Sequence, residues 1–304
     1  APPEELGGDP AAGSRPLVMR ARAGECVRVT LHNSLDAARL DSANASAQIG
    51  LRPQRISLDV TDNSGFNAGQ NPLQTVAPGS TIVYTWYAGA SDRQPDGTIR
   101  RTPIELGAIN LTPPDPAGQI PLGLVGALVI EPARSTWKVI ADDRTHARVT
   151  TEDGRVFEEV VLVHTDNLAP PEGCGQQTVA AISYTSAPSC SGTPDLRAPP
   201  SPISVYAGTP LRLRLLHPGV IGDAQLALHG HAWSNDAYTE DASALKIEPV
   251  ARVGRLSTEG AGAHHEVIIP SAGGTYEVNG DYLLHMGDPA DGAWTVLRTY
   301  SDDD

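Results

Sequence analysis

Several residue types are scarce in this chain of 304 residues, which has two Met, two Phe and four Trp. Gly and Pro are abundant instead, at 30 and 26 residues. No apolar run approaches the roughly 18 residues that a membrane-spanning helix needs. No charged segment followed by an apolar stretch opens the chain at Ala1, as a signal peptide would. We therefore expect many short strands joined by turns, no membrane span, and a mature, processed protein.

Positive charge is also scarce. The chain has 22 Lys and Arg against 36 Asp and Glu, which gives a formal net charge of -14. Its two lysines are Lys138 and Lys246. Because an acidic surface repels nucleic acid and anionic lipid, a nucleic-acid-binding function is excluded and a basic or cationic partner is favoured.

Two segments alternate between apolar and polar residues as half-buried strands do. They are residues 23–33 and residues 207–217, and each begins with Ala-Gly. In both, every second residue is apolar and we expect it to point inward, with the residues between pointing outward. The inward set is Val27, Val29, Leu31, Leu211, Leu213 and Leu215, and the outward set is Arg28, Thr30, Arg212 and Arg214. The chain therefore contains an internal duplication.

The two halves also end alike, with apolar strands at residues 123–130 and 292–298. Further strand candidates are residues 82–87, 160–164, 179–184, 266–269 and 282–285. No long amphipathic helix is predicted. The pattern predicts an all-β protein of two antiparallel sandwiches in tandem, with domains at residues 1–135 and 136–304. Residues 137–163 either begin the second domain or form a hairpin linker.

Cysteine is limited to three residues. Cys174 and Cys190 lie in a stretch rich in Gly, Pro and Ser, where a disulfide would stabilise a long connection by about 3 kcal/mol. We predict this bridge, which is typical of secreted, cell-surface or periplasmic proteins. Cys26 shares a strand face with Arg28 and Thr30, so an exposed thiol is one alternative for it.

Three segments of the first half, residues 52–58, 77–88 and 123–132, together resemble the first cupredoxin domain of bacterial multicopper oxidases. Residues 228–233 and 280–285 resemble the copper-bearing segments of a later cupredoxin domain. The resemblance covers most of the chain. It implies two tandem cupredoxin-like Greek-key β-sandwiches, and an activity that passes electrons from a Cys–His copper site to a three-copper cluster held by His-X-His pairs.

The ligands that the resemblance requires are mostly missing. In the first half, the two segments that would carry histidine pairs, residues 57–62 and 106–112, have no histidine. In the second half His229 aligns with a cluster ligand, but the two preceding ligand positions fall on Ala224 and Ala227. The His-Cys-His of the family reads His285, Met286 and Gly287. Without the thiolate the blue-copper site cannot form.

Two interpretations remain for the histidines of the second half. Either His229, His231 and His285, completed by His217 or by His264 and His265, form a remnant mononuclear metal site, or they are inherited residues satisfied by hydrogen bonds. On a strand His229 and His231 would share a face, which permits a common ion. His231, however, aligns with a position that is usually not a ligand. The neighbours His264 and His265 would point to opposite sides of a strand.

The favoured function is a structural or binding subunit, without catalytic residues or cofactor, in an exported bacterial assembly. Its partner would be another protein or subunit, for example a redox protein such as a cytochrome. The alternative is a copper-dependent oxidoreductase with a mononuclear metal near His229 and His285. An identical neighbouring chain would not supply the missing first-domain histidines, because it lacks them too.

Overall fold

The protein is described from a computed structural model. The structure describes residues 16–38, 45–141, 143–176, 178–190, 193–219, 222–234, 252–253, 255–257, 260 and 262–301. Residues 1 and 304, which bound the two predicted domains, are not among the described residues. No helix among the described residues is long and apolar enough to cross a membrane.

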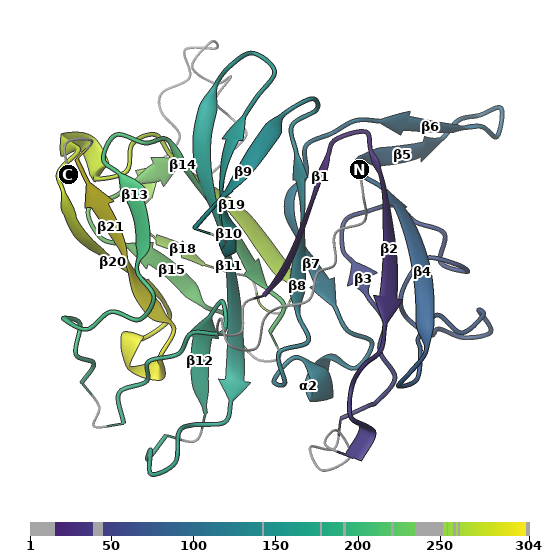
Figure 1. The fold of residues 1–304 in the computed structure, drawn as a ribbon, viewed down its shortest axis with the longest axis horizontal. Coiled ribbons are helices and arrows are strands. Elements are labelled where there is room, and N and C mark those ends of the chain that lie inside the picture. The colour runs from purple at the N-terminus through teal and green to yellow at the C-terminus, as the bar shows by residue number, and fades with distance from the viewer. Residues whose placement is uncertain are drawn as a thin grey trace.

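The first half is a sandwich of a four-stranded sheet, in the order β1-β8-β7-β3, and the pair β2-β4 (Figure 1). A hairpin, β5-β6, projects from it. Its described helix is the single turn α2 (Pro116–Gln119). The strands are β1 (Leu17–Arg22), β2 (Cys26–His32), β3 (Arg52–Pro53), β4 (Thr81–Tyr87), β5 (Ala90–Arg93), β6 (Ile99–Thr102), β7 (Gly107–Thr112) and β8 (Gly126–Glu131).

The second half is a wider sandwich. One sheet has the order β19-β14-β11-β10-β9, with β12 paired to β11, and the other has the order β13-β21-β20-β15-β18. Its first strands are β9 (Thr136–Ile140), β10 (Asp143–Thr150), β11 (Val156–Leu168), β12 (Val179–Ile182), β13 (Ile203–Tyr206) and β14 (Leu211–His217). The later ones are β15 (Gln225–Leu228), β16 (Trp233–Ser234), β17 (Arg252–Val253), β18 (Arg255–Ser257), β19 (Ala263–Ile269), β20 (Gly280–Met286) and β21 (Trp294–Tyr300). Two 3-10 turns, η3 (Gly274–Tyr276) and η4 (Pro289–Asp291), flank β20.

Strands up to β8 and strands from β9 onward belong to different sheets, so residues 137–163 open the second sandwich and are not a linker. The all-β prediction is confirmed, while the domain division after residue 135 stays a prediction. The expectation of wholly antiparallel sheets is wrong at three pairs, β1-β8, β11-β14 and β13-β21, which are parallel. In each pair a long connection crosses to another sheet before the chain returns, as parallel pairing requires.

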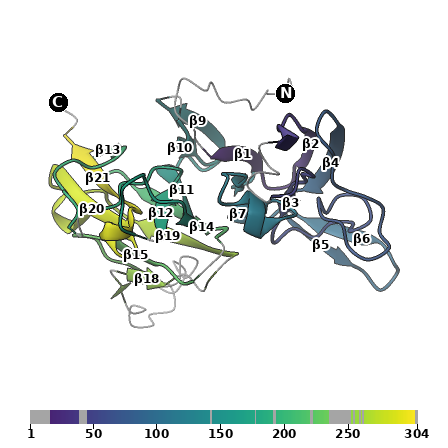
Figure 2. The same cartoon turned by 90° about the horizontal axis from the view of Figure 1, so that it is seen from below.

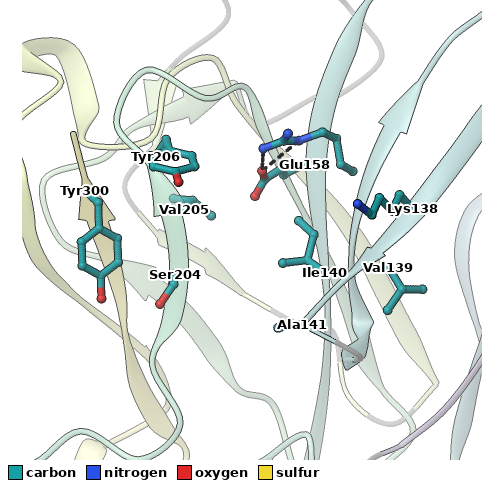
Figure 3. Close-up of a pocket in the computed structure, with 10 residues that line it drawn as sticks. Lys138, Val139, Ile140, Ala141, Glu158, Ser204, Val205, Tyr206 and Tyr300 are labelled. Carbon is teal, nitrogen blue, oxygen red and sulfur yellow. Dashed lines mark hydrogen bonds and ion pairs between the residues drawn. The ribbon is translucent and has the colours of Figure 1, made fainter. Parts of the chain in front are cut away.

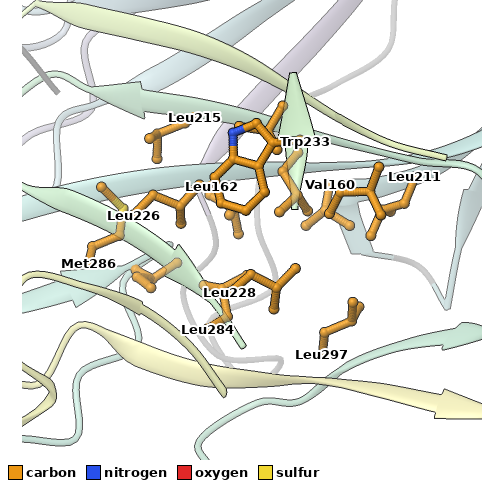
Figure 4. Packing of buried hydrophobic residues seen from close by; sticks show 14 of the residues in the cluster. Val160, Leu162, Leu211, Leu215, Leu226, Leu228, Trp233, Leu284, Met286 and Leu297 are labelled. Atoms are coloured by element: carbon orange, nitrogen blue, oxygen red, sulfur yellow. The ribbon is translucent and has the colours of Figure 1, made fainter. Parts of the chain in front are cut away.

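Three apolar clusters hold the fold together. One fills the second sandwich, where Trp233 and Met286 pack among leucines of both sheets (Figure 4). A second fills the first sandwich around Tyr84 and Trp86. The third lies between the two halves, where Val129 of β8 packs with Leu216 of β14 and with other buried aliphatic residues. Figures 1 and 2 show the halves side by side, with β7 against β14 and β19.

The strands with the duplicated pattern, β2 and β14, have different environments. In β2 the predicted alternation is observed, with Val27, Val29 and Leu31 half-buried and the exposed residues between them. Cys26 is on the exposed face and is a free thiol. In β14 Arg214 lies on the outer face as predicted, but its side chain is fully buried, whereas a half-buried strand would expose it. The outer face of β14 packs on β7 of the first half, so it is an interface and not a surface.

The predicted disulfide is confirmed. Cys174 and Cys190 are bonded, and they close a loop with a sequence separation of 16 between β11 and β13. This connection has little regular structure of its own apart from β12. The bridge therefore ties down a long crossing segment beside the second sandwich.

Candidate functional site

His231 is a buried histidine whose two ring nitrogens are both engaged by the backbone. Its Nδ1 lies 2.9 Å from the carbonyl oxygen of His229, and the amide of Gly273 donates to its Nε2 at 3.1 Å. Since Nε2 accepts a hydrogen bond, the proton is on Nδ1 and the imidazole is neutral. Burial lowers the pKa of His231, which favours the same form. No nitrogen lone pair of this ring is left for a metal ion.

His229 and His285 lie on the outer face of the β15-β20 pair. Strand β15 ends at Leu228, and Gly230 follows with a φ of 69°. His229 is therefore exposed, and the expectation that it shares a strand face with His231 is wrong. His285 is opposite Ala227, and its Nδ1 donates to the carbonyl of Gly287 at 2.7 Å. The two histidines are diagonal neighbours in this register, a relation that separates Cα atoms by roughly 7–8 Å.

His217 is separated from these three residues by the core of the second sandwich. It is fully buried at the end of β14, in the sheet opposite to β15 and β20. Its Nε2 lies 3.4 Å from Oδ2 of Asp166, and its ring is 4.7 Å from the ring of His164. Burial, with repulsion from His217, lowers the pKa of His164 to about 4. His217 therefore belongs to a different cluster from His229 and His285.

The remaining histidine candidates, His264 and His265, are neighbours on β19 and alternate in direction as expected. His264 is opposite Leu216, which belongs to the cluster between the halves, and His265 is opposite Leu215, which belongs to the core of the second sandwich. Burial, with the nearby charge of Arg55, lowers the pKa of His264 to about 4. The two rings face different compartments and cannot bind one ion together.

Asn110 of β7 lies in one of the first-half segments where a histidine pair would stand. It is fully buried and joins the two halves. Its side-chain amide donates to the carbonyl oxygens of Gly262 and Ala263 at 3.2 and 3.1 Å, and to Oε1 of Gln54 at 3.0 Å. This position is therefore used to dock the second half on the first.

A buried network of charges fills the interface beside Asn110. Arg214 is fully buried, and its Nη1 lies 2.8 Å from Glu266, its Nη2 lies 3.3 Å from Glu131, and its Nε bonds Glu159. Arg20 of β1 bonds Glu131 at 2.6 Å and also contacts Glu159. The five groups come from five strands, β1, β8, β11, β14 and β19, so the network crosses the interface between the halves.

The electrostatics of this network follow from its composition. Burial alone would lower the pKa of the Arg214 guanidinium, but the carboxylates of Glu266, Glu131 and Glu105 raise it above the ordinary value. Burial raises the pKa of Glu266, and Arg214 opposes that shift. The amide of Ala108 also donates to Oε1 of Glu266 at 3.0 Å. Arg214 is thus held as a cation whose removal would leave buried carboxylates without their partner.

The second sandwich has a groove between the β9-β10 hairpin and β13. It contains a cavity of about 480 Å³ and an adjoining one of about 300 Å³. Figure 3 shows Tyr206 and Tyr300 on one side of the larger cavity and Lys138, Ile140 and Glu158 on the other. No sequence pattern predicts this groove, because the groove depends on how the edges of two sheets lie in the fold.

The residues present do not fit the copper sites that the resemblance implies. Met286, where the thiolate would stand, is buried in the apolar core. His231 has no free nitrogen, and His229 lies on the outer face of its sheet. Among the residues that the structure describes, no group of three or more His, Cys, Asp or Glu is arranged to hold a metal ion. Copper ligation in blue-copper sites requires a thiolate and two imidazoles around one point.

Comparison with solved structures shows the fold of the chain. Copper nitrite reductase from Nitrosomonas europaea matches with a TM-score of 0.58 and 16% identity, over 95% of this chain and 85% of that chain. A multicopper oxidase matches with a TM-score of 0.54 and 14% identity, over 94% and 78% of the two chains. Blue copper oxidase from Nitrosomonas europaea matches with a TM-score of 0.53 and 17% identity, over 93% and 76%.

The sequence comparisons give no closer relation. No protein-family model matches the sequence, and no curated protein matches it. The solved structures confirm the resemblance to multicopper oxidases at the level of the fold. The chain is similar to two-sandwich copper proteins of the cupredoxin type.

Proposed function

We propose that this protein is a cupredoxin-like subunit without copper chemistry, which acts as a structural or binding component of an exported assembly. The observation that carries the proposal is the burial of Met286 in the apolar core, at the position where the thiolate ligand would stand. His231 also has both ring nitrogens occupied, by Gly273 and the carbonyl of His229. One of the two first-half segments where ligands would stand also has another role, because its Asn110 joins the two halves through hydrogen bonds.

The buried charges between the halves support a structural role. A network of Arg20, Arg214 and three glutamates specifies one arrangement of the two sandwiches, because any other arrangement leaves buried charges unpaired. The described residues contain no group arranged to hold a metal ion, and in this proposal the protein functions through its surfaces, such as loops and sheet edges. We include the division into domains 1–135 and 136–304 in this proposal.

Export is the second part of the proposal. The Cys174–Cys190 disulfide persists in oxidising compartments, which supports a secreted, cell-surface or periplasmic location. The partner in this proposal is another protein or subunit. With a net charge of -14, the chain suits a partner with a basic surface, and a redox protein such as a cytochrome is one candidate.

A redox assay tests this function. The protein is loaded with copper, dialysed and supplied in air with a phenol, ferrous ion or manganous ion, and separately with nitrite and a reductant. We expect turnover no higher than in buffer with the same copper content. The control variants are His229→Ala with His285→Ala, and His32→Ala, which removes an exposed histidine from the first half. Turnover that survives in H32A and disappears in the double variant would establish the alternative, a metal-dependent oxidoreductase.

A further inference from the structure

The groove beside β13 runs between two sheet edges. Strand β13 is the terminal strand of its sheet and β9 is the terminal strand of the facing sheet. The two cavities share Ile140, Ala141 and Ser204, so they are parts of one elongated groove. The wall formed by the four residues of β13 is about 13 Å long, at roughly 3.3 Å per residue.

The groove lies where the inner face of the β9-β10 hairpin is not part of the apolar core. Glu158 of β11 is opposite Leu211 on one side and Arg148 of β10 on the other, and Arg148 is opposite Lys138 of β9. All these residues share the inner face of the sheet. Leu211 is in the core of the sandwich, but no residue of β9 or β10 belongs to that core. The facing sheet ends at β13, and the described residues leave the inner face around Arg148 and Lys138 open to the groove.

The backbone of β13 is available for a further strand. Among the described residues β13 pairs only with β21, and the amide of Ala207 donates to the carbonyl of Tyr300. Backbone groups alternate in direction along a strand, so those of Ser204 point away from β21 and toward the groove. An edge of this kind is a template for pairing with another chain.

The charges in the groove determine which kind of side chain an added strand would place there. Lys138 and Arg148 are directly opposite each other, an arrangement of like charges that is unfavourable in a sheet. Glu158 is almost fully buried and bonds Arg148 at 2.7 Å and His146 at 3.0 Å, so it compensates Arg148. Lys138 is exposed and has no ion pair within the described part of the chain. Asp143 lines the adjoining cavity, where its carboxylate accepts hydrogen bonds from Thr145. In the larger cavity Lys138 is therefore an exposed cation without an ion pair among the described residues, in a chain of net charge -14.

We propose that this groove binds an extended peptide segment of a partner protein, which pairs with β13 as an added strand and places an acidic side chain at Lys138. Main-chain hydrogen bonds to Ser204 hold the backbone, and the cation selects the side chain, which is the usual division between affinity and specificity in strand addition. Tyr206 and Tyr300 line the same cavity and give the neighbouring side chains of the peptide an apolar surface.

This inference deepens the proposed function by naming a partner segment, and it rests on that function only for the premise that the chain acts through its surfaces. His229, His231 and His285 do not line the groove. A failed copper assay and a failed peptide assay are therefore separate results.

Selection from a displayed library of random heptapeptides tests the proposal on the full chain. We expect the wild-type protein to enrich peptides with Asp or Glu at one position and alternating residues around it. Lys138→Glu should reduce that enrichment by about tenfold and select Lys or Arg instead, because one favourable charge contact becomes repulsive. The control Arg93→Glu makes the same change in net charge on the β5-β6 hairpin and should select as the wild type does.

A second variant separates strand addition from simple capture of a carboxylate. Ser204→Pro removes an amide that points away from β21, the strand with which β13 pairs among the described residues. Proline is tolerated on an edge strand, so the protein should keep its thermal midpoint and lose peptide retention. Glutarate at millimolar concentration serves as a small dicarboxylate competitor. Absence of enrichment, enrichment unchanged in K138E, or enrichment that glutarate abolishes and S204P leaves intact would each overturn the proposal.

Discussion

Replacing Arg214 by Met tests the role that we assign to the buried charges between the halves. Methionine has a similar length but no charge. The substitution would leave Glu131, Glu159 and Glu266 without the guanidinium that contacts all three. Arg20 would remain, but it contacts only Glu131 and Glu159 within the network. Glu266 would then be a buried carboxylate without a cation beside it.

Removing one partner from a buried ion pair destabilises a protein by about 3–5 kcal/mol. We expect a loss of that size at pH 7.5, which corresponds to a fall in Tm on the order of 10 °C for a protein of this size. Without Arg214, the pKa of Glu266 rises further, because Arg214 opposes the effect of burial on this carboxyl. A carboxyl whose pKa is raised by folding contributes stability below its unfolded pKa, and this is lost as the pH rises through its folded pKa. The difference between variant and wild type should therefore shrink as the pH falls from 7.5 toward 5.

Urea unfolding followed by tryptophan fluorescence at several pH values measures this difference. Arg134→Met is the matched control, since it removes an exposed arginine that pairs with Glu152 at 2.7 Å. Surface pairs contribute little, so this control should unfold near the wild-type midpoint. A loss below about 1 kcal/mol in R214M, or a loss that does not change with pH, would refute the assignment.

Three further predictions concern the cysteines and the buried pair His164 and His217. Replacing Cys174 and Cys190 together by Ser should lower the free energy of unfolding by about 3 kcal/mol in urea titrations, and an unchanged midpoint would contradict this. Cys26 is exposed, so one thiol per native chain should react with a thiol reagent. A native protein that does not react would contradict this prediction. Burial lowers the pKa of His164 to about 4, so the wild type should lose stability as the pH falls from about 6.5 to about 4. His164→Phe should flatten that dependence in urea titrations across this range, and an unaltered slope would count against it.

The strands were the most predictable part of this molecule. Alternation in residues 23–33 and 207–217 predicts β2 and β14 correctly. The same alternation failed to predict the burial of Arg214, because periodicity shows which residues share a face but not what covers that face. On β2 the polar face meets solvent, whereas on β14 the equivalent face meets the other half of the chain.

The site was less predictable, for two physical reasons. His229 and His231 were expected on one strand face, but the strand ends between Leu228 and Gly230, and a glycine with positive φ reverses the direction of the chain. The pairing of His164 with His217 depends on the parallel register of β11 and β14, strands that are distant in sequence. Tertiary register of this kind leaves no local signal in a sequence.

The resemblance to copper proteins predicted the fold better than it predicted the chemistry. The cores of the two sandwiches consist of apolar side chains and do not depend on metal, so the fold can persist where ligands are replaced. Asn110 illustrates the replacement, since its position now carries hydrogen bonds that join the halves.

Metal content is the most direct measurement of the central claim. Protein loaded with copper and then dialysed is analysed by mass spectrometry and electron paramagnetic resonance, alongside the variant with His229→Ala and His285→Ala. Our account predicts that neither protein retains copper in a fixed ratio to the chain. About one copper per chain in the wild type, lost in the double variant, would contradict it and establish a metal site on the outer face of β15 and β20.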